Sequence, residues 1–302
     1  MNNTPSSAVV QSHDSELKSA LVKAFDAWHE PIDIRPEGVF GSVAIVRSGQ
    51  VTIDSDVLDV EFVVPFDDDM EPNEAEIIVY NLSDNTIKQL GKDDEISIEA
   101  GYKGDTGVIF KGYISKVKTK YEGVEKVTTI YAIDDIKDHT IESIAFAANT
   151  KASYILRQLI DKTGIPVAVF SPRRDHTYKD SQTVDGDLME NIKQYAEVCG
   201  ISVYVSKGKI YARYIKEGDN LNFEVSVDTG MIGSPSYYEE EVTAEDYKDT
   251  VDGYEVEMLL QHRMCAGAIV KLTSKAANGT YRVCSGEHRF SPAESVTIAK
   301  MY

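Results

Sequence analysis

The stretch that decides the fold runs from Ala75 to Val117 and reads AEIIVYNLSDNTIKQLGKDDEISIEAGYKGDTGVIFKGYISKV. Apolar and β-branched residues alternate with polar ones in AEIIVY, DEISIEAGY and VIFKGYISKV, and this two-residue period is typical of half-buried β-strands. Residues 81–90 break the alternation and predict a short helix, with Ser83 as its N-cap and Gly91 just beyond its C-terminus. We therefore expect a β domain with a helical plug between two of its strands.

The same alternation extends over residues 39–136, where Gly, Asn and Asp clusters separate seven short segments rich in β-branched and aromatic residues. Seven strands at this spacing predict a barrel or a sandwich, and we expect a barrel. The pattern returns over residues 221–302 and predicts five or six more strands. Within them, Asn278-Gly279 is the residue pair of a tight hairpin turn, in which both residues would take positive φ.

Between these two β regions the period changes to that of amphipathic helices. Gly164 and Gly200 are expected to end two such helices, and Lys207-Gly208 is expected to form a tight turn between two strands. The predicted buried faces of the two helices are Ile155, Leu156, Leu159 and Ile160 in the first, and Leu188, Ile192, Tyr195, Ala196 and Cys199 in the second.

Residues 1–30 resemble an arm. After a polar start, apolar residues recur at helical spacing, and Pro31 would end such a helix. An amphipathic helix in this position either packs on its own domain or binds a neighbouring molecule, and the sequence leaves both possibilities open. The predicted apolar stripe consists of Leu17, Ala20, Leu21, Ala24, Phe25 and Trp28.

The charge of the chain limits its partners. It has 31 Lys and Arg against 50 Asp and Glu, a formal net charge of -19. A binder of duplex nucleic acid or of anionic lipid needs a basic surface, so both classes are disfavoured. No run approaches the roughly 20 apolar residues of a membrane span, and no secretion signal is expected at the polar N-terminus. Three cysteines make no disulfide framework, so we expect a soluble protein made in a reducing cytoplasm.

One set of residues has the spacing of a zinc site. His262, Cys265, Cys284 and His288 read H-x2-C-x18-C-x3-H, and two cysteines with two histidines can bind zinc tetrahedrally. The alternative is that the cysteines are small core residues and the histidines cover strand ends. Because Cys284 lies within a predicted strand and not in a zinc knuckle, the alternative is favoured, and we expect no metal and no cofactor.

The other residues that could carry chemistry form no convergent set. Cys199 with His176 would suggest a thiol hydrolase, but Cys199 lies on the apolar face of a predicted helix, which is a core position. The acidic runs 67–69 and 239–241 could hold calcium or serve a glycosidase, but such runs are usually solvated loops. There is no nucleophile elbow and no Walker or Rossmann glycine pattern, so we expect no catalytic residue.

The predicted α/β region differs in charge from the rest of the chain. Residues 151–216 contain 11 Lys and Arg against 7 Asp and Glu. Arg173, Arg174 and Lys179 form the only local basic patch, and nucleic acid, an acidic partner protein or solvent could face it. The acidity of the remaining chain disfavours nucleic acid. We therefore take these three residues as candidates for docking on an acidic partner, with a solvated loop as the alternative.

Three segments together resemble the baseplate hub proteins of contractile phage tails and related injection particles, including the late-control protein D group. The first, 75–117, has YNLS before a short helix, then EAGY and FKGYI; the second, 183–214, is a helix followed by a hairpin. The third, 253–288, joins an apolar strand to a glycine-led strand and to NGTYRV. Each motif alone is weak, whereas their order and spacing are specific, and the resemblance covers about residues 32–302.

This resemblance implies a mainly β chain with an α+β insert, in which two tube-like β-barrels flank a small α-β-α-β-β module. We expect an N-terminal helical arm at 1–30 and a first barrel at 31–148. The module is expected at 149–217 and the second barrel at 218–302.

The resemblance also implies a function. Three copies, each with two barrels, would form a pseudo-sixfold ring that joins the sixfold tail tube to the threefold central spike. Expected partners are further copies of the chain, the tail tube protein, the spike protein and a LysM-like tail protein, with DNA only as passing cargo and no membrane.

The expected location is the baseplate of the virion tail, after assembly in the bacterial host cytoplasm. Some acids of 54–76 and 239–257 are expected to face the central channel. The resemblance implies no enzymatic activity in this chain. The alternatives are a cell-wall hydrolase and a tail-associated binding or adhesion module.

Overall fold

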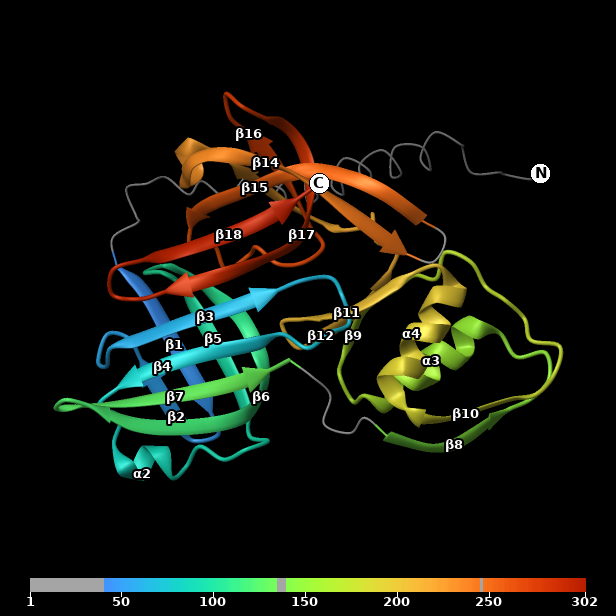
Figure 1. Cartoon of the computed structure of the whole chain (residues 1–302), viewed down its shortest axis with the longest axis horizontal. Coiled ribbons are helices and arrows are strands. Elements are labelled where there is room, and N and C mark those ends of the chain that lie inside the picture. Colours follow the sequence, from blue (N-terminus) through green and yellow to red (C-terminus); the bar gives the residue numbers. More distant parts are fainter. Residues whose placement is uncertain (1–40, 135–139, 245–246) are drawn as a thin grey trace, which may run out of the picture. The chain divides into compact units, whose positions relative to one another are not determined.

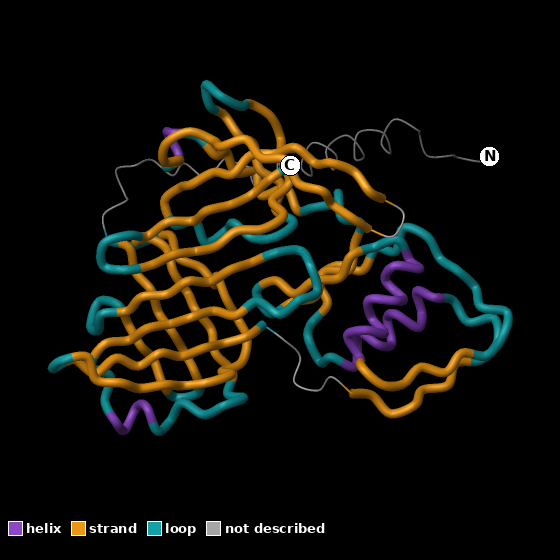
Figure 2. The backbone as a smooth tube through the Cα atoms, viewed as in Figure 1, coloured by secondary structure: helices purple, strands orange, loops and turns teal. Residues whose placement is uncertain are grey.

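A computed structural model describes residues 41–134, 140–244 and 247–302 of the chain (Figure 1). The fold is mostly β, with 57% of the described residues in strands and 12% in helices, as expected for a mainly β chain with an α+β insert. The two longer helices lie together in one α/β region (Figure 2). The predicted helical arm at 1–30 lies outside the described residues. Among those residues, no helix combines the length and the apolar character that crossing a membrane requires.

The first β region contains seven strands, one for each segment that the alternation predicted. They are β1 (Ser42–Ser48), β2 (Val51–Asp54), β3 (Val60–Phe66), β4 (Glu74–Tyr80), β5 (Glu95–Tyr102), β6 (Asp105–Glu122) and β7 (Glu125–Ile133). Their order in the sheet is β2-β1-β5-β6-β7-β4-β3, and every pairing is antiparallel. The alternate residues Ile77, Ile98 and Ile130 are fully buried in one apolar cluster. No pairing joins β2 to β3 among the described strands, so this barrel is open.

The predicted helical plug lies between β4 and β5 and is short. Helix α2 (Asp84–Ile87) begins at Ser83, whose hydroxyl accepts a hydrogen bond from the Thr86 N–H at 3.1 Å, as predicted. The expected end at Gly91 is wrong. The helix ends at Lys88, and the Gly91 N–H donates to the Asp94 carboxylate at 2.7 Å, so a side chain satisfies this amide after the helix has ended.

The α/β region is built around one apolar core. Helices α3 (Ala152–Lys162) and α4 (Leu188–Cys199) pack against each other and bury the faces that their periodicity predicts. Gly200 ends α4 with a φ of 66°, and Lys207 and Gly208 take φ values of 51° and 72° in the turn, both as predicted. The strands are β8 (Thr140–Phe146), β9 (Val167–Phe170), β10 (Gln182–Asp187), β11 (Ser202–Ser206) and β12 (Lys209–Arg213).

These five strands form two small sheets. Strands β11 and β12 are an antiparallel hairpin, and β9 pairs with β12 in parallel. Strand β8, which lies in the range that we assigned to the first barrel, pairs with β10 instead, and its Phe146 enters the core of α3 and α4.

The second β region contains six strands and a short 3-10 helix, η2 (Val227–Thr229). The strands are β13 (Asp219–Val225), β14 (Met231–Ala244), β15 (Tyr247–Leu259), β16 (Ala268–Thr273), β17 (Asn278–Phe290) and β18 (Ser295–Met301). Strands β14, β15, β18 and β17 follow one another in antiparallel order, β16 pairs with β17, and β13 pairs with β16 in parallel.

The predicted turn at Asn278-Gly279 is wrong in position. Both residues belong to β17, where they pair with Thr273 and Leu272, and neither has a positive φ. The turn lies at residues 274–277, where the Ser274 hydroxyl accepts from the Ala277 N–H at 2.9 Å. The Asn278 side chain donates to the Ser274 carbonyl oxygen at 2.7 Å, so it closes the turn from outside. These side-chain bonds favour the longer loop over a two-residue turn.

The two β regions share one sheet. Residues Phe62–Phe66 of β3 pair with Gly286–Phe290 of β17, which joins the strands of both regions into a 13-stranded sheet. Phe62 and Phe290 stack across this join with ring centroids 5.2 Å apart. A row of backbone hydrogen bonds and an aromatic pair therefore fix the second region to the first.

Candidate functional site

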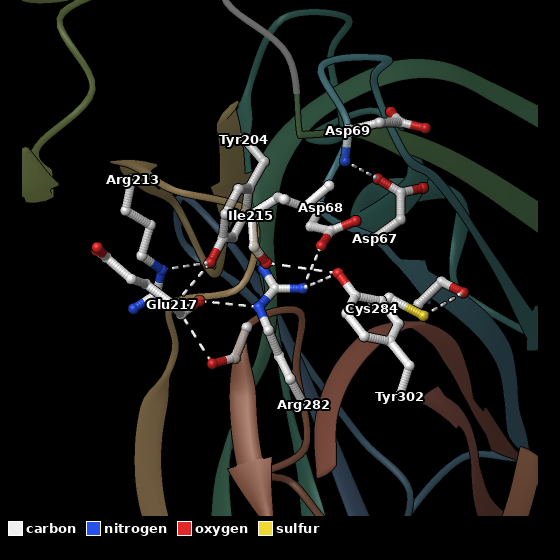
Figure 3. Close-up of polar contacts among 12 residues, drawn as sticks. Asp67, Asp68, Asp69, Tyr204, Arg213, Ile215, Glu217, Arg282, Cys284 and Tyr302 are labelled. Atoms are coloured by element: carbon white, nitrogen blue, oxygen red, sulfur yellow. Dashed lines mark hydrogen bonds and ion pairs between the residues drawn. The ribbon is translucent and has the colours of Figure 1, made fainter. Parts of the chain in front are cut away.

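A buried polar junction lies where the β3–β4 loop, the α/β region and the end of the chain meet (Figure 3). At its centre the Arg282 guanidinium forms an ion pair with Asp68. The Arg282 Nε donates to the Glu217 carbonyl oxygen at 2.8 Å, and Nη1 donates to the Tyr302 hydroxyl at 3.2 Å. The Tyr302 hydroxyl in turn donates a hydrogen bond to the Ile215 carbonyl oxygen at 3.4 Å. The Arg282 side chain of β17 thus contacts three partners from three parts of the chain.

Burial sets the electrostatics of this junction. Arg282 is only 5% exposed, so the ion pair lies in surroundings that solvate charge poorly. Burial raises the pKa of Asp68 even though the neighbouring Arg282 guanidinium lowers it, and burial raises the pKa of Tyr302 to about 12. A buried pair of this kind is costly to break, because either partner alone would remain as an uncompensated charge.

A second buried arginine extends the junction into the α/β region. Arg213, at the end of β12, is 3% exposed, and its Nη2 donates to the Tyr204 hydroxyl at 2.6 Å. The same Nη2 lies 3.4 Å from the Gly267 carbonyl oxygen, and Nη1 forms an ion pair with Asp219 at 3.0 Å. Arg213 therefore ties the β11–β12 hairpin to the segment before β16.

A separate cluster joins the tip of the β5–β6 hairpin to the β15–β16 connection. Arg263 grips the Asp105 carboxylate with two nitrogens at 2.6 and 2.7 Å, and His262 Nε2 lies 3.1 Å from the same carboxylate. Hydrogen bonds from Arg263 are the main reason that the pKa of Asp105 falls to about 2. Lys207, in the β11–β12 turn, donates to the His262 carbonyl oxygen at 2.6 Å, so all three regions meet here as well.

Two carboxylates that share one amide lie beside the junction. The Asn73 N–H donates to Asp134 at 2.7 Å, and the Asn73 side-chain amide lies 3.3 Å from Asp134 and 3.5 Å from Asp67. Burial is the main cause that raises the pKa of Asp134 to about 7 and that of Asp67 to about 6. The Asp67 carboxylate adds to the shift at Asp134, and the neighbouring Asp69 and Asp68 add to the shift at Asp67.

This pair should make stability depend on pH. A carboxyl group whose pKa is raised by folding contributes stability that is present below its unfolded pKa and lost as the pH rises through its folded pKa. For Asp134 that window runs from 3.8 to about 7. We expect Asp134→Asn to leave the free energy of unfolding almost unchanged below about pH 3.5 and to raise it by about 1–3 kcal/mol at pH 8.

Urea unfolding of the wild type and the variant at both pH values measures this difference. The exposed Asp180, changed to Asn, is the control and should show no pH-dependent gain. A constant difference between wild type and Asp134→Asn across the pH range would contradict the prediction.

The structure does not gather the four zinc candidates. His262 faces Asp105, while His288 is buried, hydrogen-bonds Thr297 at 2.8 Å and has a pKa that burial lowers to about 3. The Cys284 thiol donates to the Lys300 carbonyl oxygen at 3.4 Å, and Cys265 is half-buried. Within the described ranges, no three His, Cys, Asp or Glu side chains come together as a metal-binding group.

Two of the three residues of the basic patch make contacts within the chain. Arg174 donates to the Val198 and Glu197 carbonyl oxygens at 3.0 and 2.9 Å, so it caps the C-terminus of α4. The Arg173 guanidinium lies over the Tyr214 ring, 4.1 Å from its centroid. Lys179 is exposed.

We expect Arg174→Ala to lower the free energy of unfolding by about 1 kcal/mol, because the Val198 and Glu197 carbonyl oxygens lose the guanidinium as a donor. Lys179→Ala is the matched control, and its change should stay within about 0.5 kcal/mol. Differential scanning calorimetry of the two variants measures this, and equal melting temperatures would show that the cap contributes nothing.

Cys199 and the acidic run at 67–69 also have defined places. Cys199 is fully buried, and burial raises the pKa of its thiol to about 11, which suits a core residue and not a nucleophile. The run is not simply a solvated loop, since Asp68 is in the buried ion pair with Arg282.

No sequence pattern connected the residues of the buried junction, although the acidic run 67–69 contains Asp68. Asp68 and Arg282 are 214 positions apart, and Asp105 and Arg263 are 158 apart. No local spacing connects such residues. The one available signal was the rarity of arginine within the apolar strand TYRVCSG, where a buried arginine requires an acidic partner.

The chemistry of these clusters is that of structural joints. In each, the charged groups are paired with one another or with backbone carbonyls of a different region, and the arginine side chains are buried or half-buried. Such groups hold elements in a fixed register and are not presented to a substrate. The geometry therefore indicates that ion pairs and hydrogen bonds fix the two β regions and the α/β region to one another.

Comparisons with known proteins agree with a structural role. The family model described as Baseplate hub gp41 matches residues 75–291. No curated protein matches the chain.

Solved structures share the fold. The 43 kDa tail protein of prophage MuSo2 from Shewanella oneidensis is 8% identical, with a TM-score of 0.61 over 86% of this chain and 97% of that one. The tail protein from Neisseria meningitidis MC58 is 9% identical, with a TM-score of 0.60 over 87% and 96%. The c3393 protein of E. coli, a component of the type VI secretion system described as similar to T4 tail proteins gp27 and gp5, is 9% identical, with a TM-score of 0.59 over 85% and 76%.

The family match covers well over half of the chain, and it spans the β3–β17 join, the α/β region and most of the second β region. It confirms the resemblance that the sequence motifs carried. The chain belongs to the Baseplate hub gp41 family, and its role is a structural one in the baseplate of a phage tail.

Proposed function

We propose that this chain forms a homotrimeric ring that joins the tail tube to the central spike. The observation that carries the proposal is the pairing of β3 with β17, because it makes the two β regions of each copy parts of one sheet. Three copies would then present six β regions toward a sixfold tube while keeping threefold symmetry toward a spike. The buried Arg282–Asp68 pair supports the same reading, because an adaptor needs its two β regions in a fixed relation.

The domain division is part of this proposal. In it, the arm is 1–30, the first barrel is 31–148, the module is 149–217 and the second barrel is 218–302. Strand β8 belongs to the range of the first barrel but pairs with β10 of the module. Proposed partners are the tail tube protein, the spike protein and a LysM-like tail protein, and the exposed Arg173, Arg174 and Lys179 are the proposed contact for an acidic one. Some acids of 54–76 and 239–257 would face a channel through which DNA passes.

Native mass spectrometry of the full chain, alone and mixed with the tube and spike proteins of the same particle, tests the ring. We expect a trimer, either alone or on addition of a partner. A monomer under both conditions, a stable dimer or a hexamer would contradict the symmetry. The tube protein alone serves as the control for assembly that does not involve this chain.

We also propose that the chain has no enzymatic activity and that it assembles in the host cytoplasm before its place in the virion. The family is a structural one, which supports the first point. Purified sacculi incubated with the protein should keep their turbidity. Clearing that disappears on mutation of a single acidic or cysteine residue would establish a hydrolase instead.

A further inference from the structure

Strand β6 is longer than its neighbour β5 and extends beyond it. Strand β5 pairs with β6 only as far as Tyr113, and after the irregularity at Ser115 the remaining residues pair with β7 alone. Residues 116–122 therefore have a side with no strand neighbour among the described pairings. Along this segment the exposed residues Lys116, Lys118 and Lys120 alternate, and we refer to these three as the lysine row.

The charge of the lysine row is largely unmatched. Lys116 has no ion pair with any described residue, and Lys118 lies over the Tyr131 ring at 5.3 Å. Lys120 pairs with Glu122 at 2.6 Å, but both side chains are more than half exposed, so this pair contributes little. Lysines on an open strand edge also prevent unspecific pairing between strands, so a specific partner has to bring negative charge.

A surface of opposite character lies on the β14–β15 hairpin and on β17. In the register of the two strands, Tyr237 lies opposite Tyr254, and Glu239 lies opposite Asp252. Tyr254 contacts Tyr281 edge to face at 5.6 Å and Tyr237 at 5.9 Å. We refer to these five residues as the acidic tyrosine patch. Tyr237, Glu239 and Asp252 are exposed, with 56% of Tyr237 accessible.

The acidic tyrosine patch lacks a cation. Glu239 and Asp252 are like charges directly opposite each other, which destabilises a strand pair, and no Lys or Arg among the described residues forms an ion pair with either. The Tyr237 hydroxyl donates to Glu239 at 2.8 Å, and this bond is the main reason that the pKa of Tyr237 rises to about 12. Tyrosine rings and carboxylates together bind an ammonium group well.

We propose that the lysine row of one copy binds the acidic tyrosine patch of a second copy. The two surfaces are complementary in charge, yet six strands, from β15 to β7, separate β14 from β6 in the order of the sheet, and no described interaction joins them within the chain. Two different surfaces of one chain that fit each other make a heterologous contact, which closes into a ring when the rotation allows. The inference rests on the proposed self-assembly and assigns Glu239 and Asp252 to the contact and not to the channel.

Cross-linking of isotopically mixed protein tests the contact directly. Equal amounts of unlabelled and nitrogen-15-labelled full chain are treated with a carbodiimide, which joins amines to carboxylates in contact. We expect mixed-isotope peptides that link Lys116 or Lys118 to Glu239 or Asp252. Such peptides arise only between copies.

Charge reversal gives the second arm. We expect Lys116→Glu with Lys118→Glu to weaken self-association at low salt by at least about tenfold, and Glu239→Lys with Asp252→Lys to do the same. All four changes together should restore association. Lys209→Glu with Lys275→Glu is the control, because these exposed lysines lie elsewhere and the net charge changes equally. Analytical ultracentrifugation measures each association constant.

The outcomes separate this contact from the ring itself. A trimer that resists both reversals, or reversals that act no more strongly than the control, overturns the contact and leaves the proposed function. A chain that stays monomeric at every concentration, with and without tube and spike proteins, overturns both. Cross-links from the lysine row to the tube protein alone would assign the row to that partner and overturn the proposal.

Discussion

Arg282→Met is expected to destabilise the fold by about 3–5 kcal/mol, since it leaves Asp68 as a buried charge without a partner. The Glu217 carbonyl and the Tyr302 hydroxyl lose a donor in the same step. Because the junction connects three parts of the chain, we expect the loss over the whole molecule and not in one strand. Chemical unfolding followed by circular dichroism measures it.

A control lies on the same strand. Arg289 pairs with Glu287, but its side chain is 44% exposed, so Arg289→Met should cost less than about 1 kcal/mol. Combining Arg282→Met with Asp68→Leu should recover a large part of the loss, because an apolar pair leaves no charge unpaired. Similar losses for the two arginine variants, or no recovery in the double variant, would mean that the ion pair does not hold the junction.

Gly286→Val is expected to cost roughly 3–5 kcal/mol. Gly286 stands where β17 pairs with β3 on one side and β18 on the other. A Cβ atom there would lie 2.2 Å from the Ile298 carbonyl oxygen and 2.6 Å from the Phe66 ring. The carbonyl belongs to a paired backbone and cannot turn away, so the strands that join the two β regions would have to separate.

Gly279→Val, on the same strand, is the matched comparison. Its Cβ would meet only the Tyr281 ring, at 3.0 Å, and that ring is half-buried and can shift. Since Gly279 has no positive φ, the strain of a tight turn does not apply, and we expect a change below about 1 kcal/mol. The melting temperatures of the Gly286→Val and Gly279→Val variants test this prediction. Equal decreases in melting temperature would show that a side chain at Gly286 does not disturb the β3–β17 pairing.

Local patterns predicted most of the elements. Alternation located all seven strands of the first β region, and helical periodicity located the buried residues of α3 and α4. Gly200 and the Lys207-Gly208 pair were assigned correctly because each conformation depends on the residues at that position. Asn278-Gly279 was assigned wrongly because the Ser274 side chain offered the backbone a competing set of hydrogen bonds.

What the sequence by itself determined is therefore most of the strands and helices, though not β8 and β10, the buried faces of those predicted elements and, through the order of its motifs, the family. The tertiary structure alone decided which strand lies beside which, as in the β3–β17 pairing, and where Arg282 finds Asp68. Alternation fixes the buried face of a strand but leaves its hydrogen-bonding edge open to any neighbour. A buried charge likewise requires an opposite charge, and only the folded chain brings one from 214 residues away.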